Sequence, residues 1–172
     1  KTMGPVKQAL TDSGYSKSIK VDDFFFRFLG FWIGDGFTNN YHNTERVGLL
    51  FDGKKDSKLC DYYYKNIKKR FGVNNITKSV QGGLINLYFR DKPLRIWLTE
   101  NFRTYDDKRD WVGKRLPAWF LGINKSQFKS FIQGYIESDG YTDSLGRRNI
   151  NTKEKDLAMF VQLLALRFGI VY

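Results

Sequence analysis

The sequence has little cysteine, histidine or proline, with one, one and three residues, and it has no long hydrophobic run. A single cysteine, Cys60, excludes an internal disulfide and any metal site built from several thiolates. A single histidine, His42, excludes a histidine-rich metal centre, so a bound metal would need oxygen ligands, which favours magnesium over zinc. The apolar runs are too short to span a bilayer, and residues 1–20 lack the apolar stretch of a signal peptide. We therefore expect an intracellular protein that is not secreted and has no membrane partner.

Basic residues are in large excess, because 29 Lys and Arg stand against 18 Asp and Glu and give a formal net charge of +11. Such an excess on a small folded domain causes self-repulsion, which a polyanionic partner would offset. Nucleic acid is the favoured partner. A lysine-rich surface that reflects a biased genome is the alternative. An anionic membrane surface is disfavoured, because no basic amphipathic helix stands out.

Hydrophobic periodicity predicts a mixed α+β domain, and 41% hydrophobic residues are enough for a real core. Residues 1–23 are interpreted as a linker or N-terminal extension. Helices are predicted over residues 24–37, 56–71, 93–102, 126–139 and 157–168. Strands are predicted over residues 47–51 and 147–151, with a hairpin at Gly82-Gly83. The charged segment 103–115 is interpreted as a connection, and Ser126 as a helix cap.

The order helix, Asp-Gly, strand, helix, Arg-Phe-Gly occurs twice. Asp35 and Asp139 occupy the same place in the two copies, 104 positions apart. We expect a first repeat with its connection over residues 24–125 and a second over 126–172, packed about a pseudo-two-fold axis. The second copy lacks the hairpin and helix that follow the first. We interpret it as incomplete and the sequence as a fragment of a longer chain; a domain that lost those strands is the alternative.

Small residues recur four positions apart on the helices that end in Asp-Gly. A glycine inside a helix costs roughly 1 kcal/mol relative to alanine, so a repeated pair predicts close contact of two helix backbones. Each aspartate near a helix C-terminus faces the negative end of the macrodipole, and a divalent cation would reverse that penalty. The alternative is that each Asp-Gly is only a helix-terminating turn. The predicted helix-interface residues are Gly30, Gly34, Gly134 and Ser138.

Residues 28–36 (FLGFWIGDG) and 132–140 (IQGYIESDG) resemble the two nine-residue motifs of the LAGLIDADG homing endonucleases. The segment 114–117 (KRLP) resembles the lysine-and-proline block of the intein-encoded members of that family. Residues 157–170 resemble their later helical block. The resemblance covers most of residues 24–172 and is closest to the two-motif, monomeric type.

By this resemblance, each repeat has an αββαββα plan, and antiparallel sheets form a saddle over the major groove of double-stranded DNA. The metal-binding and catalytic acids are then Asp35 and Asp139, and Mg²⁺ is the implied cofactor. Lys114 carries over as a catalytic lysine that steadies the scissile phosphate or polarises the attacking water; a plain surface lysine is the alternative. Ile33 departs from the family pattern at the sixth motif position.

Alternation along the strands nominates one polar face for base contacts, although a solvent-exposed face would have the same pattern. The predicted DNA-binding residues are Arg46, Thr77, Ser79, Gln81, Asn86, Tyr88, Arg90 and Arg147.

The function implied is site-specific, Mg²⁺-dependent cleavage of double-stranded DNA by a monomer with internal pseudo-symmetry, encoded within an intein or a mobile intron. The chain itself shows no splicing residues, since Lys1 is not a nucleophilic start and no His-Asn pair ends the chain. One alternative is a catalytically inactive nucleic-acid binder on the same fold, a maturase or a regulator. Another is a structural or protein-binding domain whose basic charge is incidental.

Overall fold

The computed structural model describes residues 20–41, 44–106, 108 and 111–170. Most of the predicted N-terminal linker, residues 1–19, lies outside the described residues, as does His42. Of that segment, Asp22 caps the first described helix by accepting a hydrogen bond from the backbone N–H of Phe25 at 3.2 Å, and Asp23 is the first residue of the helix.

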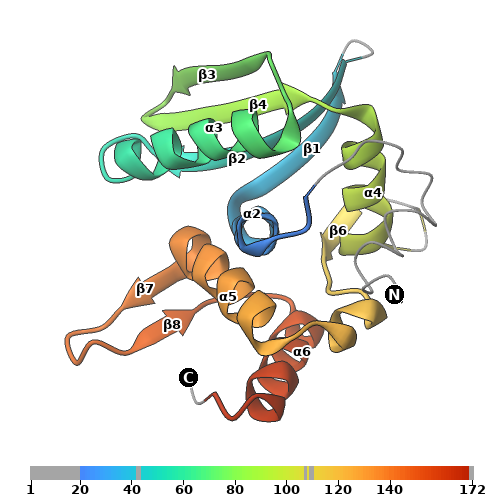
Figure 1. The fold of residues 1–172 in the computed structure, drawn as a ribbon, viewed down its shortest axis with the longest axis vertical. Coiled ribbons are helices and arrows are strands. Elements are labelled where there is room, and N and C mark those ends of the chain that lie inside the picture. The colour runs from blue at the N-terminus through green and yellow to red at the C-terminus, as the bar shows by residue number, and fades with distance from the viewer. Residues whose placement is uncertain (1–19, 42–43, 107, 109–110, 171–172) are drawn as a thin grey trace.

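The first repeat has the predicted αββαββα order. Its elements are α2 (Asp23–Asp35), β1 (Gly36–Tyr41), β2 (Thr44–Asp52), α3 (Ser57–Phe71), β3 (Ile76–Gln81), β4 (Leu84–Arg90) and α4 (Lys92–Phe102). The four strands form one antiparallel sheet in the order β1-β2-β4-β3. In Figure 1, α3 lies across this sheet and α2 is seen nearly end-on between the sheet and the second repeat.

A short connection leads into the second repeat. It contains the antiparallel pair β5 (Arg103–Tyr105) and β6 (Trp111–Lys114) and a 3₁₀ turn over Ala118–Gly122. The second repeat then repeats the first four elements as α5 (Lys125–Asp139), β7 (Gly140–Thr142), β8 (Arg148–Ile150) and α6 (Lys155–Arg167). The four-stranded sheet and the β7–β8 hairpin lie on opposite sides of the α2–α5 pair (Figure 1).

Glycines with positive φ end the elements where the sequence predicts a stop. Gly72 and Gly169 have φ of 61° after α3 and α6, in the left-handed region where only glycine is free of strain. Gly82 and Gly83, at 59° and 81°, form the two-residue turn between β3 and β4. These turns confirm the predicted hairpin and both helix ends.

The core lies between α2 and the inner face of the sheet. Every residue of α2 from Phe24 to Ile33, apart from Arg27, is buried, so this helix is enclosed on all sides. Strand β4 alternates strictly between buried and less buried residues, and its buried side chains pair directly with buried side chains of β2: Val47 with Phe89, Leu49 with Leu87, and Phe51 with Ile85. The residues between them lie on the outer face. No helix among the described residues is long and apolar enough to cross a membrane.

Three local predictions need correction. The segment 103–115 is not a plain connection, because most of it forms the β5–β6 pair. Helix α5 is capped by Asn124 rather than Ser126: the Asn124 side chain accepts from the Gln127 N–H at 3.0 Å, and the Gln127 side chain accepts from the Asn124 N–H at 2.9 Å. The predicted helix 24–37 is too long, because α2 ends at Asp35 and β1 begins at Gly36; only the family plan implied β1 and β7, whose polar sequences show no alternating pattern.

Candidate metal and DNA-binding site

Helices α2 and α5 touch backbone to backbone at the predicted small residues. A Cβ on Gly30 would lie 1.9 Å from the carbonyl oxygen of Phe131, and a Cβ on Gly134 would lie 1.9 Å from that of Arg27. Each of these contacts maps onto the other when 104 is added to or subtracted from the residue numbers. The crossing is therefore pseudo-two-fold symmetric, and any larger side chain at either glycine would push the helices apart.

The same crossing brings the two helix ends together. A Cβ on Gly34 would lie 2.0 Å from the hydroxyl oxygen of Ser138 and 3.0 Å from the carboxylate Oδ2 of Asp139. The Asp139 carboxylate therefore lies beside the last turn of α2, which ends at Asp35. The structure thus places all four predicted interface residues at the crossing of the helices that carry both predicted acids: Gly30, Gly34, Gly134 and Ser138.

Both carboxylates are half-buried in an unfavourable electrostatic setting. Burial raises the pKa of Asp139 to about 6, and the negative charge of Asp35 adds to the shift, while the Lys114 ammonium opposes it. Burial likewise raises the pKa of Asp35. The charge of Lys114 opposes this shift, and the charge of Asp56 adds to it. Among the described residues, neither carboxylate accepts a hydrogen bond from a side chain or a backbone N–H. Half-buried carboxylates close together and without donors are a site that a cation would stabilise.

Lys114, at the end of β6, caps the C-terminus of α2. Its ammonium donates hydrogen bonds to the carbonyl oxygens of Trp32, Gly34 and Gly36 at 2.7, 2.9 and 2.7 Å. Because an ammonium has three N–H donors, all of them are used. Burial lowers the pKa of Lys114 to about 8, although the charges of Asp139 and Asp35 favour its protonated form. Lys114 thus lies next to both acids, bound to the backbone that carries Asp35.

A divalent cation fits this site. The two acids offer hard oxygen ligands of the kind that Mg²⁺, Mn²⁺ and Ca²⁺ take in proteins. Within the part of the chain that the structure describes, no group of three or more His, Cys, Asp or Glu residues could hold a metal. Asp35 and Asp139 would therefore act as a pair, with the other coordination positions left to oxygens of water or of a bound phosphate.

The outer face of the sheet gathers the residues predicted to contact DNA. Thr77 and Ser79 on β3 pair with Tyr88 and Asn86 on β4, and directly paired residues share a face. Gln81, Leu84, Arg90 and Arg46 complete the same face, through the pairs Gln81 with Leu84 and Arg46 with Arg90. The Arg46 guanidinium lies 4.8 Å from the centre of the Tyr88 ring. The predicted polar face therefore exists, with an exposed apolar residue, Leu84, at its edge.

Arg147 lies apart from that face, in the turn of the β7–β8 hairpin. Its side chain forms an ion pair with Asp143, with Nε 2.7 Å from Oδ2. It belongs to the second repeat, where it precedes β8 and is highly exposed.

Two groups near the site were missed by the sequence analysis. Glu154 lines a cavity of about 490 Å³ together with Asp139 and Lys114. A Cβ on Gly113 would lie 2.5 Å from the Glu154 carboxyl carbon, so the glycine leaves room for this acid. The second group is an ion pair between Arg27 and Glu137 across the helix crossing. Neither has a local sequence signal, because each contact joins residues far apart in the chain.

Comparison with solved structures identifies the architecture. The fold is similar to that of the homing endonuclease I-DmoI in complex with DNA and Mn, with a TM-score of 0.61 and 18% identity over 87% of this chain and 80% of that one. I-DmoI in complex with DNA and Ca gives a TM-score of 0.62 and 17% identity over 86% of this chain and 72% of that one.

Two curated relatives are much longer than this chain. An iron-sulfur cluster assembly SufBD family protein from Mycobacterium leprae is 28% identical over 83% of this chain and 15% of its own length. An uncharacterized protein from Methanocaldococcus jannaschii is 24% identical over 99% of this chain and 20% of its own length. The family model described as a LAGLIDADG-like domain matches residues 127–172. The chain therefore has the LAGLIDADG homing endonuclease fold, and its second repeat matches a LAGLIDADG-like domain.

Proposed function

We propose that this chain is a metal-dependent endonuclease that cuts double-stranded DNA at a specific site. The observation that carries the proposal is the pair of half-buried carboxylates, Asp35 and Asp139, at the ends of two crossing helices, to which no described residue donates a hydrogen bond. The net charge of +11 and the polar outer face of the sheet support a duplex DNA partner. Solved structures of similar fold include a homing endonuclease in complex with DNA and Mn or Ca.

Asp35 and Asp139 would hold the metal, for which we propose Mg²⁺ in the cell. Bound there, a divalent cation supplies Lewis-acid stabilisation of the scissile phosphate and lowers the pKa of a coordinated water. The chain's own residues fix where the two acids and the positive charge lie. The backbone contact at Gly30 and Gly134 sets where the helices end. Lys114 neutralises the α2 terminus and adds a fixed positive charge beside both acids.

We propose that the Lys114 ammonium acts while it stays hydrogen-bonded to the backbone carbonyl oxygens at the end of α2. Its three donors are used by carbonyl oxygens, so a direct bond to phosphate would require it to leave at least one of them. The positive charge of Lys114 would still attract a bound phosphate near the acids, because the Coulomb energy depends on the distance between the charges and does not require a free N–H donor. The plain surface-lysine alternative is disfavoured by these three hydrogen bonds.

The outer sheet face is proposed to read the major groove. Asn86 and Arg90 lie on β4, and Thr77, Ser79 and Gln81 follow the edge strand β3 beside them. Side chains of these types pair with base edges in the major groove. The β7–β8 hairpin, with Arg147, would contact the neighbouring DNA half-site as the pseudo-symmetric counterpart of β1–β2.

The setting we propose is a mobile element inside a host reading frame, either an intein or an intron. A match to only 15% of the length of an iron-sulfur cluster assembly family protein is the pattern that an inserted domain produces. We further propose that the chain acts as a monomer, since the two unlike repeats already provide both acids.

Cleavage is tested by incubating the purified protein with a plasmid library of randomised duplex inserts, with Mg²⁺, with Mn²⁺ or with a chelator. Linearised plasmids enriched for one sequence in the presence of metal are the expected result, and light scattering should give the mass of one chain. Sequence-specific retention of duplexes without nicking in any metal would favour the inactive binder. Absence of any salt-dependent DNA binding would favour a structural domain.

A further inference from the structure

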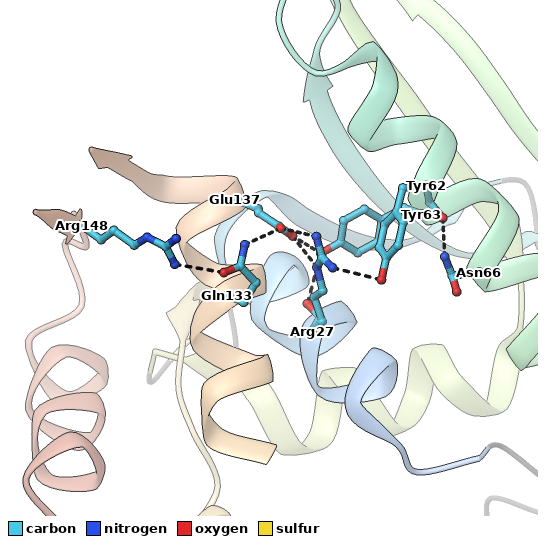
Figure 2. Close-up of polar contacts among 7 residues, drawn as sticks. All are labelled: Arg27, Tyr62, Tyr63, Asn66, Gln133, Glu137 and Arg148. Carbon is cyan, nitrogen blue, oxygen red and sulfur yellow. Dashed lines mark hydrogen bonds and ion pairs between the residues drawn. The ribbon is translucent and has the colours of Figure 1, made fainter. Parts of the chain in front are cut away.

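A partly buried polar cluster joins the two repeats on one side of the helix crossing (Figure 2). Arg27 on α2 donates from Nε to the Glu137 carboxylate on α5 at 2.8 Å, and its NH2 group makes a second, shorter contact to the other carboxylate oxygen. The pair is bidentate, the geometry in which a guanidinium fixes the plane as well as the position of its partner. Glu137 is largely buried, with 11% of its side chain exposed.

Two further donors complete the coordination of Glu137. The hydroxyl of Tyr63, on α3, donates to Glu137 Oε2 at 2.9 Å, and the amide of Gln133, one turn earlier on α5, donates to Oε1 at 2.7 Å. Burial, and next the charge of Glu137, raises the pKa of Tyr63 well above its ordinary value, so its hydroxyl remains a donor. The acid therefore has a full set of donors from three helices.

The cluster extends to α3 at one end and to the β7–β8 hairpin at the other. Arg27 donates to the Tyr62 hydroxyl at 3.0 Å, and its guanidinium lies 4.3 Å from the centre of the Tyr62 ring. At the other end, Arg148 of β8 donates to the side-chain oxygen of Gln133 at 3.1 Å. Figure 2 shows this continuous row from α3 through α2 and α5 to the β7–β8 hairpin.

The pseudo-symmetric positions are apolar. Arg27 corresponds to Phe131, and Glu137 corresponds to Ile33, when 104 is added or subtracted. Both Phe131 and Ile33 are buried in the core. One side of the crossing thus carries a charged pair with directional hydrogen bonds, and the equivalent residues on the other side carry none. Apolar contacts tolerate sliding and rotation better than a bidentate pair does.

We infer that Arg27 and Glu137 are positioning residues that fix the rotation and register of α5 on α2 and so set the separation of Asp35 and Asp139. Glu137 precedes Asp139 by two residues on the same helix, so a rotation of α5 that breaks the pair also moves the acid. The effect on cleavage rests on the proposed function. The positioning of α5 on α2 does not.

The geometry is tested without catalysis. Nitroxide labels at Asn39→Cys and Thr142→Cys, in a Cys60→Ala background, report the distance between the strands that leave the two acids. We expect one narrow distance distribution in the parent protein and a broader or shifted one after Glu137→Gln or Arg27→Leu. The charge-reversed pair Arg27→Glu with Glu137→Arg should narrow it again. Asp61→Asn, which removes the exposed ion pair with Lys78, is the matched control and should leave it unchanged.

The catalytic consequence uses the duplex recovered from the plasmid selection. Single-turnover cleavage by Glu137→Gln should slow by about 10- to 100-fold with unchanged duplex affinity, which is the usual effect of losing support behind metal ligands. Arg27→Lys keeps the charge and loses the bidentate geometry, and it covers the case in which Glu137→Gln fails to fold. Unchanged distance distributions in the folded Arg27→Lys, Arg27→Leu and Glu137→Gln variants would overturn the inference. If the parent protein cuts no duplex, the proposed function fails, and the label distances still decide the positioning role.

Discussion

Helices α2 and α5 each end in an aspartate, yet the two helix ends have different surroundings. At the end of α2, the Lys114 ammonium donates hydrogen bonds to three backbone carbonyl oxygens beside Asp35. At the end of α5, Asp139 borders the cavity that Glu154 also lines, and the pKa of Asp139 is raised to about 6. A duplicated motif therefore places two acids symmetrically, while the segments packed around it give them different surroundings.

The largest effect is expected from removing either acid. Asp35→Asn and Asp139→Asn should each lower the cleavage rate by at least about 1,000-fold, because a metal ligand supplies several kcal/mol of transition-state stabilisation. Duplex affinity, measured by fluorescence anisotropy with Ca²⁺ present, should change little. Full cleavage by either variant would show that the two ends are not a shared site.

The next largest effect concerns the symmetry of the crossing. Gly30→Ala and Gly134→Ala should each lower the free energy of unfolding by about 3 kcal/mol or more, since each Cβ would meet a backbone carbonyl that cannot rotate away. Urea denaturation measures both, with Ser130→Ala on α5 as the control. Equal losses would agree with the symmetric contact, whereas a tolerated alanine at either position would contradict it.

A smaller effect concerns the dependence of stability on pH. Asp139 holds its proton up to about pH 6 in the folded protein and only to its ordinary value of 3.8 when unfolded. Between these values the folded state binds more protons, so the free energy of unfolding should fall as the pH rises from about 4 to about 6. The melting temperature without metal should follow, and Asp139→Asn should remove much of the slope. Added Mn²⁺ should raise the melting temperature at pH 7 more than at pH 5, because it binds the ionised pair.

The smallest effect compares the sheet with the hairpin. Arg90→Ala, on the outer face of β4, should weaken binding of the selected duplex by about 1 kcal/mol or more. Arg147→Ala should cost less, because the Arg147 side chain is ion-paired with Asp143 in an exposed turn. Affinities measured across a salt series would distinguish base contacts from phosphate contacts, since only the loss of a phosphate contact reduces the salt dependence of binding. A larger loss from Arg147→Ala would contradict this ranking.

The parts of the fold that follow from local chemistry were predictable. The Gly82-Gly83 turn, the Gly72 stop and the alternation of Ile85, Leu87 and Phe89 each require only neighbouring residues. The Asp-Gly repeat with its paired small residues predicted the crossing, because two copies of a rare pattern in a helix imply one shared packing role.

What could not be predicted depends on contacts between distant segments. Strand β1 is polar, so it forms because β2 pairs with it and not because of its own pattern. The segment with β5 and β6 is charged, yet it folds back to place Lys114 at the end of α2, 80 residues away from Gly34. Glu137 gave no sign of its role, since its partners Arg27 and Tyr63 lie 110 and 74 positions away.

The central claim is that α2 and α5 present Asp35 and Asp139 to one divalent cation, and a crystal grown with Mn²⁺ tests it most directly. Anomalous scattering should place Mn²⁺ in contact with both carboxylates, and the Mn²⁺ signal should be lost in crystals of Asp35→Asn. Mn²⁺ bound elsewhere, or carboxylates that bind none at a concentration supporting cleavage, would contradict the account.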